Sequence, residues 1–197
     1  MIEYSFEKSG IFPNHIQSER INYIPIHEYG VSVRECYNKF SELDPQTTKY
    51  VSFDSHESVT ESKEYMDRVE EEYKSGEQAS YLMELRQTGD WIGTGTLDIT
   101  WDRKIAESGI YLFEEYWGNG YGTERGETMV EVAFGEYDIE KWVSRCAVDN
   151  VASKKSIEKY VVQNGGEKYG RIPNMKVGET VYDLFVYVID ESEYNGG

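Results

Sequence analysis

Residues 117–124 have the composition of a loop that receives an anionic group. The segment reads WGNGYGTE, with glycine at 118, 120 and 122, and it stands between an expected strand and an expected helix. Glycine lets the backbone turn tightly and lets a ligand approach it closely. The unpaired N–H groups and the dipole at a helix start favour a phosphate there. The loop lacks the Gly-Lys-Ser/Thr of a nucleotide P-loop, and it follows a meander rather than opening a βαβ unit, which excludes the dinucleotide fingerprint.

A locally basic segment lies downstream of that loop. Residues 141–159 hold five Lys or Arg and two Asp or Glu, in a chain whose net charge is −17. A polyanionic ligand needs such local compensation, because the chain as a whole repels it. Lys154 and Lys155 follow Asn150 closely and could face a phosphate. Taken alone, each lysine is better explained as an ordinary residue of a helix surface.

The overall charge indicates the class of partner. The chain has 37 Asp and Glu against 20 Lys and Arg. A protein that binds nucleic acid needs a basic face to displace counterions, so we expect no nucleic-acid partner. An acidic protein suits a cationic partner such as a basic peptide, a polyamine or an aminoglycoside. Solvation alone nevertheless explains most of these charges.

Three further features predict the location of the protein. No apolar run approaches the roughly 18 residues of a membrane helix, and the N-terminus lacks the basic start and apolar stretch of a signal peptide. Two cysteines, Cys36 and Cys146, do not make a disulfide framework and indicate reduced, buried thiols. We therefore expect a cytoplasmic protein with no membrane partner. No residue cluster resembles a metal site, so no metal is expected.

The hydrophobic spacing predicts one sheet flanked by helices. Residues 1–18 are expected to be irregular, and 20–26 to form a first strand whose Pro25 limits it to an edge or an end. Further strands are expected at 81–85, 91–101, 107–113, 142–148 and 181–189, and helices at 29–40, 58–75, 122–136 and 152–163. The predicted fold class is therefore α/β with a mixed sheet, in a single domain over 1–197.

On these motifs the chain resembles the GNAT acyl-CoA N-acyltransferases, and within them the RimJ/RimL-like group of ribosomal-protein N-acetyltransferases. The family's loop, Gln/Arg-x-x-Gly-x-Gly/Ala, is matched at Gly120 and Gly122, and Asn150 to Lys159 resembles the group's "N-x-x-S…x-E-K". Glu19-Arg20-Ile21 is similar to its "ERL" start, and the likeness runs over about residues 16–190. The chain departs from the pattern at Trp117, which replaces Gln or Arg, and after Lys159, where Gly-Phe is missing.

The resemblance implies a GNAT fold of about seven strands and four helices, acetyl-CoA as the co-substrate and no metal. Pantetheine would pair with the backbone of Leu112 and Phe113, where the strand parts from its neighbour and leaves it unpaired. The cofactor-binding residues that it implies are Leu112, Phe113, Trp117, Gly118, Asn119, Gly120, Tyr121, Gly122, Thr123, Asn150, Ser153 and Lys155.

The resemblance also suggests the catalytic groups. Many GNAT enzymes use a tyrosine seven residues after the Asn as the acid, but Ile157 stands there. The RimJ/RimL-like group implies Ser153 instead, and the alternative for Ser153 is a plain helix N-cap. Asn150 is expected to orient the cofactor or the main chain.

A carboxylate beside the central strands could act as the base that activates the amine. Glu107 is the preferred candidate because it precedes the strand expected to line the cofactor. The other candidates are Glu84, Asp98 and Asp149, whereas His15, His27 and His56 are expected on the surface.

The resemblance implies an N-acetyltransferase that acts on a primary amine, the α-amine of a protein N-terminus. One alternative is the same chemistry on a small amine such as a polyamine or an aminoglycoside. A second alternative is an acyl-CoA-binding module without catalysis. The partners expected are acyl-CoA and a cationic acceptor, with the protein as a monomer or a homodimer.

Overall fold

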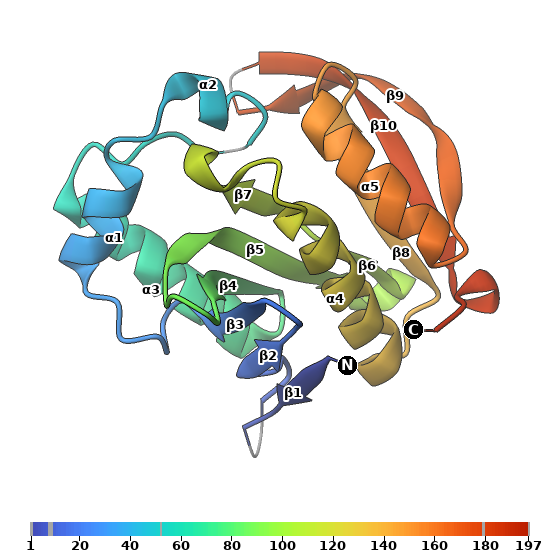
Figure 1. Ribbon diagram of the computed structural model, residues 1–197, viewed down its shortest axis with the longest axis horizontal. Coiled ribbons are helices and arrows are strands. Elements are labelled where there is room, and N and C mark those ends of the chain that lie inside the picture. Colours follow the sequence, from blue (N-terminus) through green and yellow to red (C-terminus); the bar gives the residue numbers. More distant parts are fainter. Residues whose placement is uncertain (1, 8–9, 52, 179, 197) are drawn as a thin grey trace.

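The computed structural model describes residues 2–7, 10–51, 53–178 and 180–196, and in them one mixed sheet runs through the molecule (Figure 1). Its strands are β1 (Glu3–Ser5), β2 (His15–Gln17), β3 (Ile21–Pro25), β4 (Gln78–Leu85), β5 (Trp91–Thr100), β6 (Ile105–Glu107), β7 (Ile110–Leu112), β8 (Lys141–Ala147), β9 (Glu167–Val177) and β10 (Thr180–Asp190). They lie in the order β1-β2-β3-β4-β5-β6-β8-β10-β9, with β7 also paired to β5.

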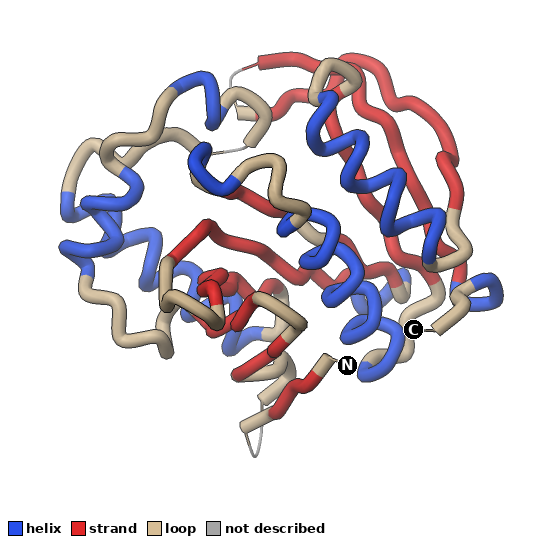
Figure 2. The backbone as a smooth tube through the Cα atoms, in the orientation of Figure 1, coloured by secondary structure: helices blue, strands red, loops and turns tan. Residues whose placement is uncertain are grey.

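The helices are α1 (Val33–Phe40), α2 (Pro45–Thr48), α3 (Val59–Ser75), α4 (Tyr121–Glu136) and α5 (Val151–Gln163). In β4, Leu82 packs with Cys36, Phe40 and Val69 of α1 and α3, whereas Tyr81 and Met83 share a core with residues of α4. Because neighbouring residues of a strand point to opposite faces, α1 and α3 cover one face of the sheet and α4 covers the other. There α4 contacts α5, and in Figures 1 and 2 these two helices lie in front of the sheet.

The sheet is divided where β7 and β8 separate. β6 pairs with β8 in parallel through three residue pairs, the last being Glu107 opposite Val143. β7 pairs with β5 instead, and β8 runs on to Ala147 without a partner on that side among the described residues. The bend lies at 108–109, where the N–H of Gly109 donates to Thr96 Oγ1 at 2.9 Å. We call this separation the fork; its closed end is at Glu107, and its open end leads to the starts of α4 and α5.

Most of the expected elements are confirmed, and three expectations are wrong. Residues 1–18 contain β1 and β2, so 20–26 is not the first strand; β3 is internal to the sheet, and Pro25 is at its end. The expected strand 107–113 begins at Ile105 and is broken into β6 and β7. β9 was not expected, and the described chain therefore has ten strands rather than seven. Four helices have eight residues or more, as expected.

Candidate functional site

The loop 118–122 presents a row of unbonded amides. Gly118 and Gly120 have φ angles of 76° and 81°, in the left-handed region that favours glycine, and Gly120 is the N-cap of α4. Among the described residues, the N–H groups of 118–122 donate no hydrogen bond, while Gly120 O accepts from Thr123 and Glu124. Left-handed residues beside right-handed ones turn successive N–H groups toward one concavity, which suits an anion. The start of α4 adds its dipole.

Arg20 holds this loop from the turn before β3. Its Nη1 donates to Asn119 O at 3.0 Å, and its Nε donates to Glu124 at 2.6 Å. The guanidinium carbon lies 4.5 Å from the centre of the Tyr121 ring. Ser18 Oγ donates to the same carboxylate at 2.8 Å. From the sequence alone, Glu19-Arg20-Ile21 was identified only as a motif. Glu124, the acid that follows the glycine loop, was the signal that could have linked Arg20 to that loop.

Trp117 connects the loop to β7. Its Nε1 donates to Leu112 O at 2.8 Å. Phe113 N–H donates to Ile92 O at 3.0 Å, so the expectation that the Phe113 backbone is unpaired is wrong. Since backbone groups alternate in direction along a strand, the N–H of Leu112 points away from β5, toward the fork. Leu112 thus leaves its N–H, but not its carbonyl, open to a ligand.

The first two turns of α4 are in close contact with the middle of α5. A Cβ on Gly122 would lie 3.1 Å from Ser156 Oγ, and one on Gly126 would lie 2.3 Å from the Tyr160 ring. Thr123 Oγ1 also lies 3.2 Å from Ser156 Oγ. Gly122 therefore serves helix packing, whatever it does for a ligand.

Asn150 caps α5, because its side-chain oxygen accepts the N–H of Ser153 at 3.1 Å. The alternative interpretation of Ser153 as the N-cap is therefore wrong. Ser153 is half-buried in the first turn, and Lys155 is exposed. Lys154 Nζ lies 5.5 Å from the Phe185 ring centre, which is a packing role.

A cleft of about 350 Å³ lies at the closed end of the fork. Its lining residues are Thr96, Asp98, Thr100, Glu107, Ser108, Gly109, Val143 and Arg145. Glu107 is ion-paired with Arg145. Asp98 accepts hydrogen bonds from Thr96 and Gln78, and burial raises the pKa of its carboxyl. A carboxyl whose pKa is raised toward neutrality is better suited to take up a proton.

The predicted catalytic residues do not lie together. Glu107 is opposite Val143, and β8 extends four residues further before the turn to α5. That separates Glu107 from the Ser153 helix start by about 13 Å of strand. Glu84 lies outside the cleft, bonded to Tyr29 and Asn22.

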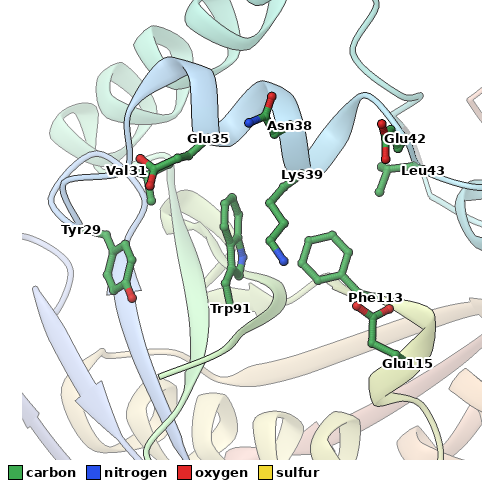
Figure 3. Close-up of a pocket in the computed structure, with 10 residues that line it drawn as sticks. All are labelled: Tyr29, Val31, Glu35, Asn38, Lys39, Glu42, Leu43, Trp91, Phe113 and Glu115. Carbon is green, nitrogen blue, oxygen red and sulfur yellow. The ribbon is translucent and has the colours of Figure 1, made fainter. Parts of the chain in front are cut away.

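A second cleft, of about 640 Å³, lies between α1 and the N-terminal end of β5 (Figure 3). Its lining residues are Tyr29, Val31, Glu35, Asn38, Lys39, Glu42, Leu43, Trp91, Phe113 and Glu115. Lys39 Nζ lies 4.9 Å from the Phe113 ring centre, and Figure 3 shows Lys39 between Trp91 and Phe113. Hydrogen bonds from Ser32 lower the pKa of Glu35, which keeps its carboxylate charged. Sequence reasoning did not find this cleft.

The histidines differ from expectation. His56 is buried, stacked on Phe40 and bonded to Ser62 Oγ at 2.7 Å, and burial lowers its pKa. His27 is partly buried, and burial lowers its pKa as well. Neither histidine lines a cleft at the fork. The described residues contain no group of three or more His, Cys, Asp or Glu placed to hold a metal ion. No helix in the described ranges has both the length and the apolar character to cross a bilayer.

Comparison with known proteins gives consistent matches. The sequence profile described as "Acetyltransferase (GNAT) domain" matches residues 35–160. The "Uncharacterized N-acetyltransferase p20" of Bacillus licheniformis is 21% identical over 155 residues, which are 78% of this chain and 85% of that protein.

Solved structures share the fold. The microcin C7 self-immunity acetyltransferase MccE, in complex with acetyl-CoA and AMP, has a TM-score of 0.77 at 16% identity, over 92% of this chain and 98% of that one. Spermidine N-acetyltransferase from Vibrio cholerae, with CoA and spermine, has a TM-score of 0.71 at 18% identity, over 90% and 99%. A candidate ribosomal-protein-serine acetyltransferase from Vibrio cholerae has a TM-score of 0.69 at 15% identity, over 89% and 97%.

Proposed function

Because the chain belongs to the GNAT acetyltransferase family and is therefore an acyltransferase, we propose that it transfers the acetyl group of acetyl-CoA to the α-amine of a protein N-terminus. The observation that supports the co-substrate is the row of unbonded amides at 118–122, at the start of α4 and next to the open end of the fork. The choice of acceptor rests on the resemblance to the RimJ/RimL-like group. When bound, acetyl-CoA supplies the thioester carbonyl that the amine attacks.

The residues around the fork fit this co-substrate. The amides of 118–122 would receive its pyrophosphate, and exposed Lys155 could approach a phosphate from α5. The open N–H of Leu112 would bond the pantetheine arm as an added strand does. These contacts would orient the arm along the fork, with the thioester toward the closed end.

The cleft at the closed end supplies carboxylates for an incoming amine. Asp98 and Glu107 are register partners on β5 and β6, and both line the cleft. An ammonium group must lose a proton before it can attack. We assign this step to the Asp98–Glu107 pair; Arg145 fixes the Glu107 carboxylate, and burial favours the protonated form of Asp98.

Ser153 is a candidate contact to the co-substrate at the open end of the fork. Its first-turn position favours binding over proton donation at the closed end, so Ser153→Ala is expected to weaken acetyl-CoA binding rather than lower kcat. A fall in kcat at unchanged affinity would return Ser153 to the role of general acid.

A polyamine is the second candidate acceptor, and the acidic cleft beside α1 favours it. Glu35, Glu42 and Glu115 line that cleft together with aromatic Trp91 and Phe113. Carboxylates attract the second ammonium of a polyamine, while the ring face of Phe113 already carries the Lys39 ammonium. The fold is shared with proteins described as a candidate ribosomal-protein-serine acetyltransferase and a spermidine N-acetyltransferase.

Release of free thiol from acetyl-CoA distinguishes the acceptors. The panel contains one basic peptide with a free N-terminus, the same peptide with the N-terminus blocked, spermidine and spermine. We expect turnover with the free peptide alone. Turnover with spermidine and not with the peptide would replace the proposed acceptor, and no turnover with any amine would contradict catalysis.

Binding of acetyl-CoA is tested separately by thermal shift. Gly120→Val should abolish the shift, since its side chain would stand among the amides and its φ of 81° is unfavourable for valine. Gly170→Ala, with no atom within 4 Å of the added Cβ, is the matched control. An unchanged shift in Gly120→Val would remove the loop from the site.

A further inference from the structure

Arg125 is a buried cation that forms no close ion pair among the described residues, and Asp98 is the one carboxylate that acts on its pKa electrostatically. Its side chain is 3% exposed, and it is the one Lys, Arg, Asp or Glu side chain that is buried in the described part of the chain. Its Nη1 donates to Ser108 Oγ, while its Nε is buried without an acceptor. None of the ion pairs among the described residues includes Arg125. A guanidinium group stays charged in such surroundings.

Burying an unpaired charge opposes folding. The desolvation of a cation is repaid only by close counter-charges and complete hydrogen bonding. Arg125 has one bonded hydroxyl and an orphaned donor. An apolar side chain of similar length would fit the same interior at a lower cost in folding free energy. The arginine therefore requires an explanation other than stability.

The path of the side chain leads to the closed end of the fork. Arg125 leaves the second turn of α4 and passes Gly95 of β5, where an added Cβ would lie 3.6 Å from Arg125 Cδ. It ends at Ser108, in the bend between β6 and β7. Ser108 also lines the cleft that holds Asp98 and Glu107.

This contact fixes the role that the Ser108 hydroxyl can take. Its oxygen accepts a hydrogen bond from Arg125, so its single proton is left to donate elsewhere. A hydroxyl that accepts from a cation is a stronger donor, because hydrogen bonds in a chain polarise one another. Ser108 lies opposite Leu97 in the strand register, so its hydroxyl is on the α4 face of the sheet, whereas the Asp98 and Glu107 side chains are on the other face. Because Ser108 is the first residue beyond the β6–β8 pairing, the hydroxyl stands at the closed end of the fork.

We propose that Ser108 is a catalytic hydrogen-bond donor to the thioester carbonyl oxygen, and that Arg125 is the residue that positions and polarises it. The inference rests on the proposed acetyl transfer. The amine nitrogen forms a bond to the carbonyl carbon, and the carbonyl oxygen takes the π-electron pair while Ser108 Oγ–H donates to it. The electron pair on oxygen then re-forms the carbonyl bond as the C–S bond breaks, and sulfur keeps the electron pair of that bond. The proton released by the amine passes to the Asp98–Glu107 pair and from there to the thiolate.

The test uses four variants of the full chain. Ser108→Ala removes the donor, Arg125→Met removes the charge at similar length, Arg125→Lys keeps the charge, and the double variant removes both groups. The control is Ser62→Ala, which deletes a buried hydroxyl that is bonded to His56 on the α1/α3 face. For each we measure kcat, KM for acetyl-CoA, Tm and the infrared carbonyl stretch of bound [1-¹³C]acetyl-CoA.

Ser108→Ala and Arg125→Met should each lower kcat about 10²- to 10³-fold, the usual effect of losing one oxyanion donor, with little change in KM. The double variant should lose little more than either single one, because the two groups act as a unit. Arg125→Lys should recover part of the activity. The carbonyl stretch should move to higher frequency in Ser108→Ala, and the Tm of Arg125→Met should stay level or rise. The control should match wild type in kcat and stretch.

Two results would overturn the inference. Full activity of Ser108→Ala with an unshifted carbonyl stretch would remove Ser108 from the reaction. A large loss of Tm in Arg125→Met with kcat unchanged would show that Arg125 is structural. If the wild-type protein acetylated no amine, the proposed function would fail, and the infrared comparison would still decide whether Ser108 contacts the carbonyl.

Discussion

Arg20 shows how one side chain can support a binding loop from a distant part of the sequence. It bonds the carbonyl of Asn119 and the carboxylate of Glu124, and it covers the Tyr121 ring. Glu124 is only 13% exposed, so loss of the arginine leaves a partly buried carboxylate without its cation. The expected consequence is a loop whose amides no longer converge on one point.

We predict that Arg20→Ala weakens acetyl-CoA binding about 10-fold, since a hydrogen bond to a charged group is worth about 1.5–3 kcal/mol. Calorimetric titration measures the change in Kd. Arg103→Ala, an exposed arginine of the 101–103 turn, is the control and should bind as wild type does. Equal affinity in both variants would mean that the loop keeps its shape without Arg20.

Asp98 gives a pH-dependent prediction. Burial raises the pKa of its carboxyl above the ordinary 3.8, so the folded state favours the protonated form. The stability from this preference is fully present below about 3.8 and is lost as the pH rises through the raised pKa. Asp98→Asn should therefore raise Tm at pH 7, and the gain should vanish near pH 3. Parallel curves of Tm against pH would show that Asp98 is unperturbed.

At the residue scale, the sequence predicted the glycine loop but not its supports. Gly118 and Gly120 were recognisable because a turn of this kind restricts the residue type. Phe113 was placed wrongly, because the backbone direction of a strand residue depends on pairing register, which one sequence does not reveal. Arg125 lies in the helix expected at 122–136, and its burial follows from tertiary packing alone.

At the element scale, the contact between α4 and α5 depends on small residues. Gly126 faces the Tyr160 ring at a distance that leaves no room for a methyl group. The Tyr160 hydroxyl in turn lies 2.7 Å from Ser144 Oγ of β8, and this hydrogen bond fixes the position of the ring against the sheet. The spacing of these two helices therefore sets the geometry at the open end of the fork.

Gly126→Ala should destabilise the protein by about 1–3 kcal/mol through overpacking, seen as a fall in Tm of several degrees. Gly135→Ala in the same helix is the control, because its added Cβ meets only the Tyr4 hydroxyl, at 3.3 Å. That variant should keep or slightly raise Tm, as alanine favours a helix. Equal Tm values for the two variants would contradict the packing role of Gly126.

The elements that escaped prediction have physical reasons. β9 carries Gly170 and Pro173 and is mostly exposed, so it lacks the apolar alternation that indicates a strand. It is tolerated as the edge strand beside β10, with one register shift at Pro173 and another beside Gly170. The break between β6 and β7 arises from pairing with two different partners, which hydrophobic spacing does not encode. The helices and the central strands were predicted because their periodicity was strong.

At the scale of the whole molecule, charge is unevenly distributed. Residues 54–77 hold nine acids and three bases. All three bases pair within α3, in Lys63–Asp67, Arg68–Glu72 and Lys74–Glu70. The net charge of the segment therefore resides on the other acids, among them exposed Glu57, Glu64 and Glu71.

We predict that kcat/KM for a basic peptide falls with salt more steeply than for a neutral peptide, since steering is screened over about 8–10 Å. Replacing Glu57, Glu64 and Glu71 by Gln should flatten that dependence without breaking an ion pair. Replacing the paired Glu70 and Glu72 serves as the comparison and should also lower Tm slightly. Parallel salt curves for the two peptides would assign the charge to solvation alone.

The fork makes the sheet two partly independent bodies joined at a short seam. Among the described residues, three residue pairs of β6 and β8 bridge the strands there. The amides of Ser144 and Cys146 face β10, whereas those of Arg145 and Ala147 face the fork, so the latter two should exchange with deuterium much faster than those of β5. A ligand that lies along Leu112 would fill the fork as an added strand between β7 and β8. Local unfolding on one side of the fork would then be coupled to local unfolding on the other. Acetyl-CoA should therefore slow exchange on both sides of the seam, while peptides from α1 exchange unchanged. Protection confined to the glycine loop would mean that the ligand is held at its phosphates and leaves the two bodies uncoupled.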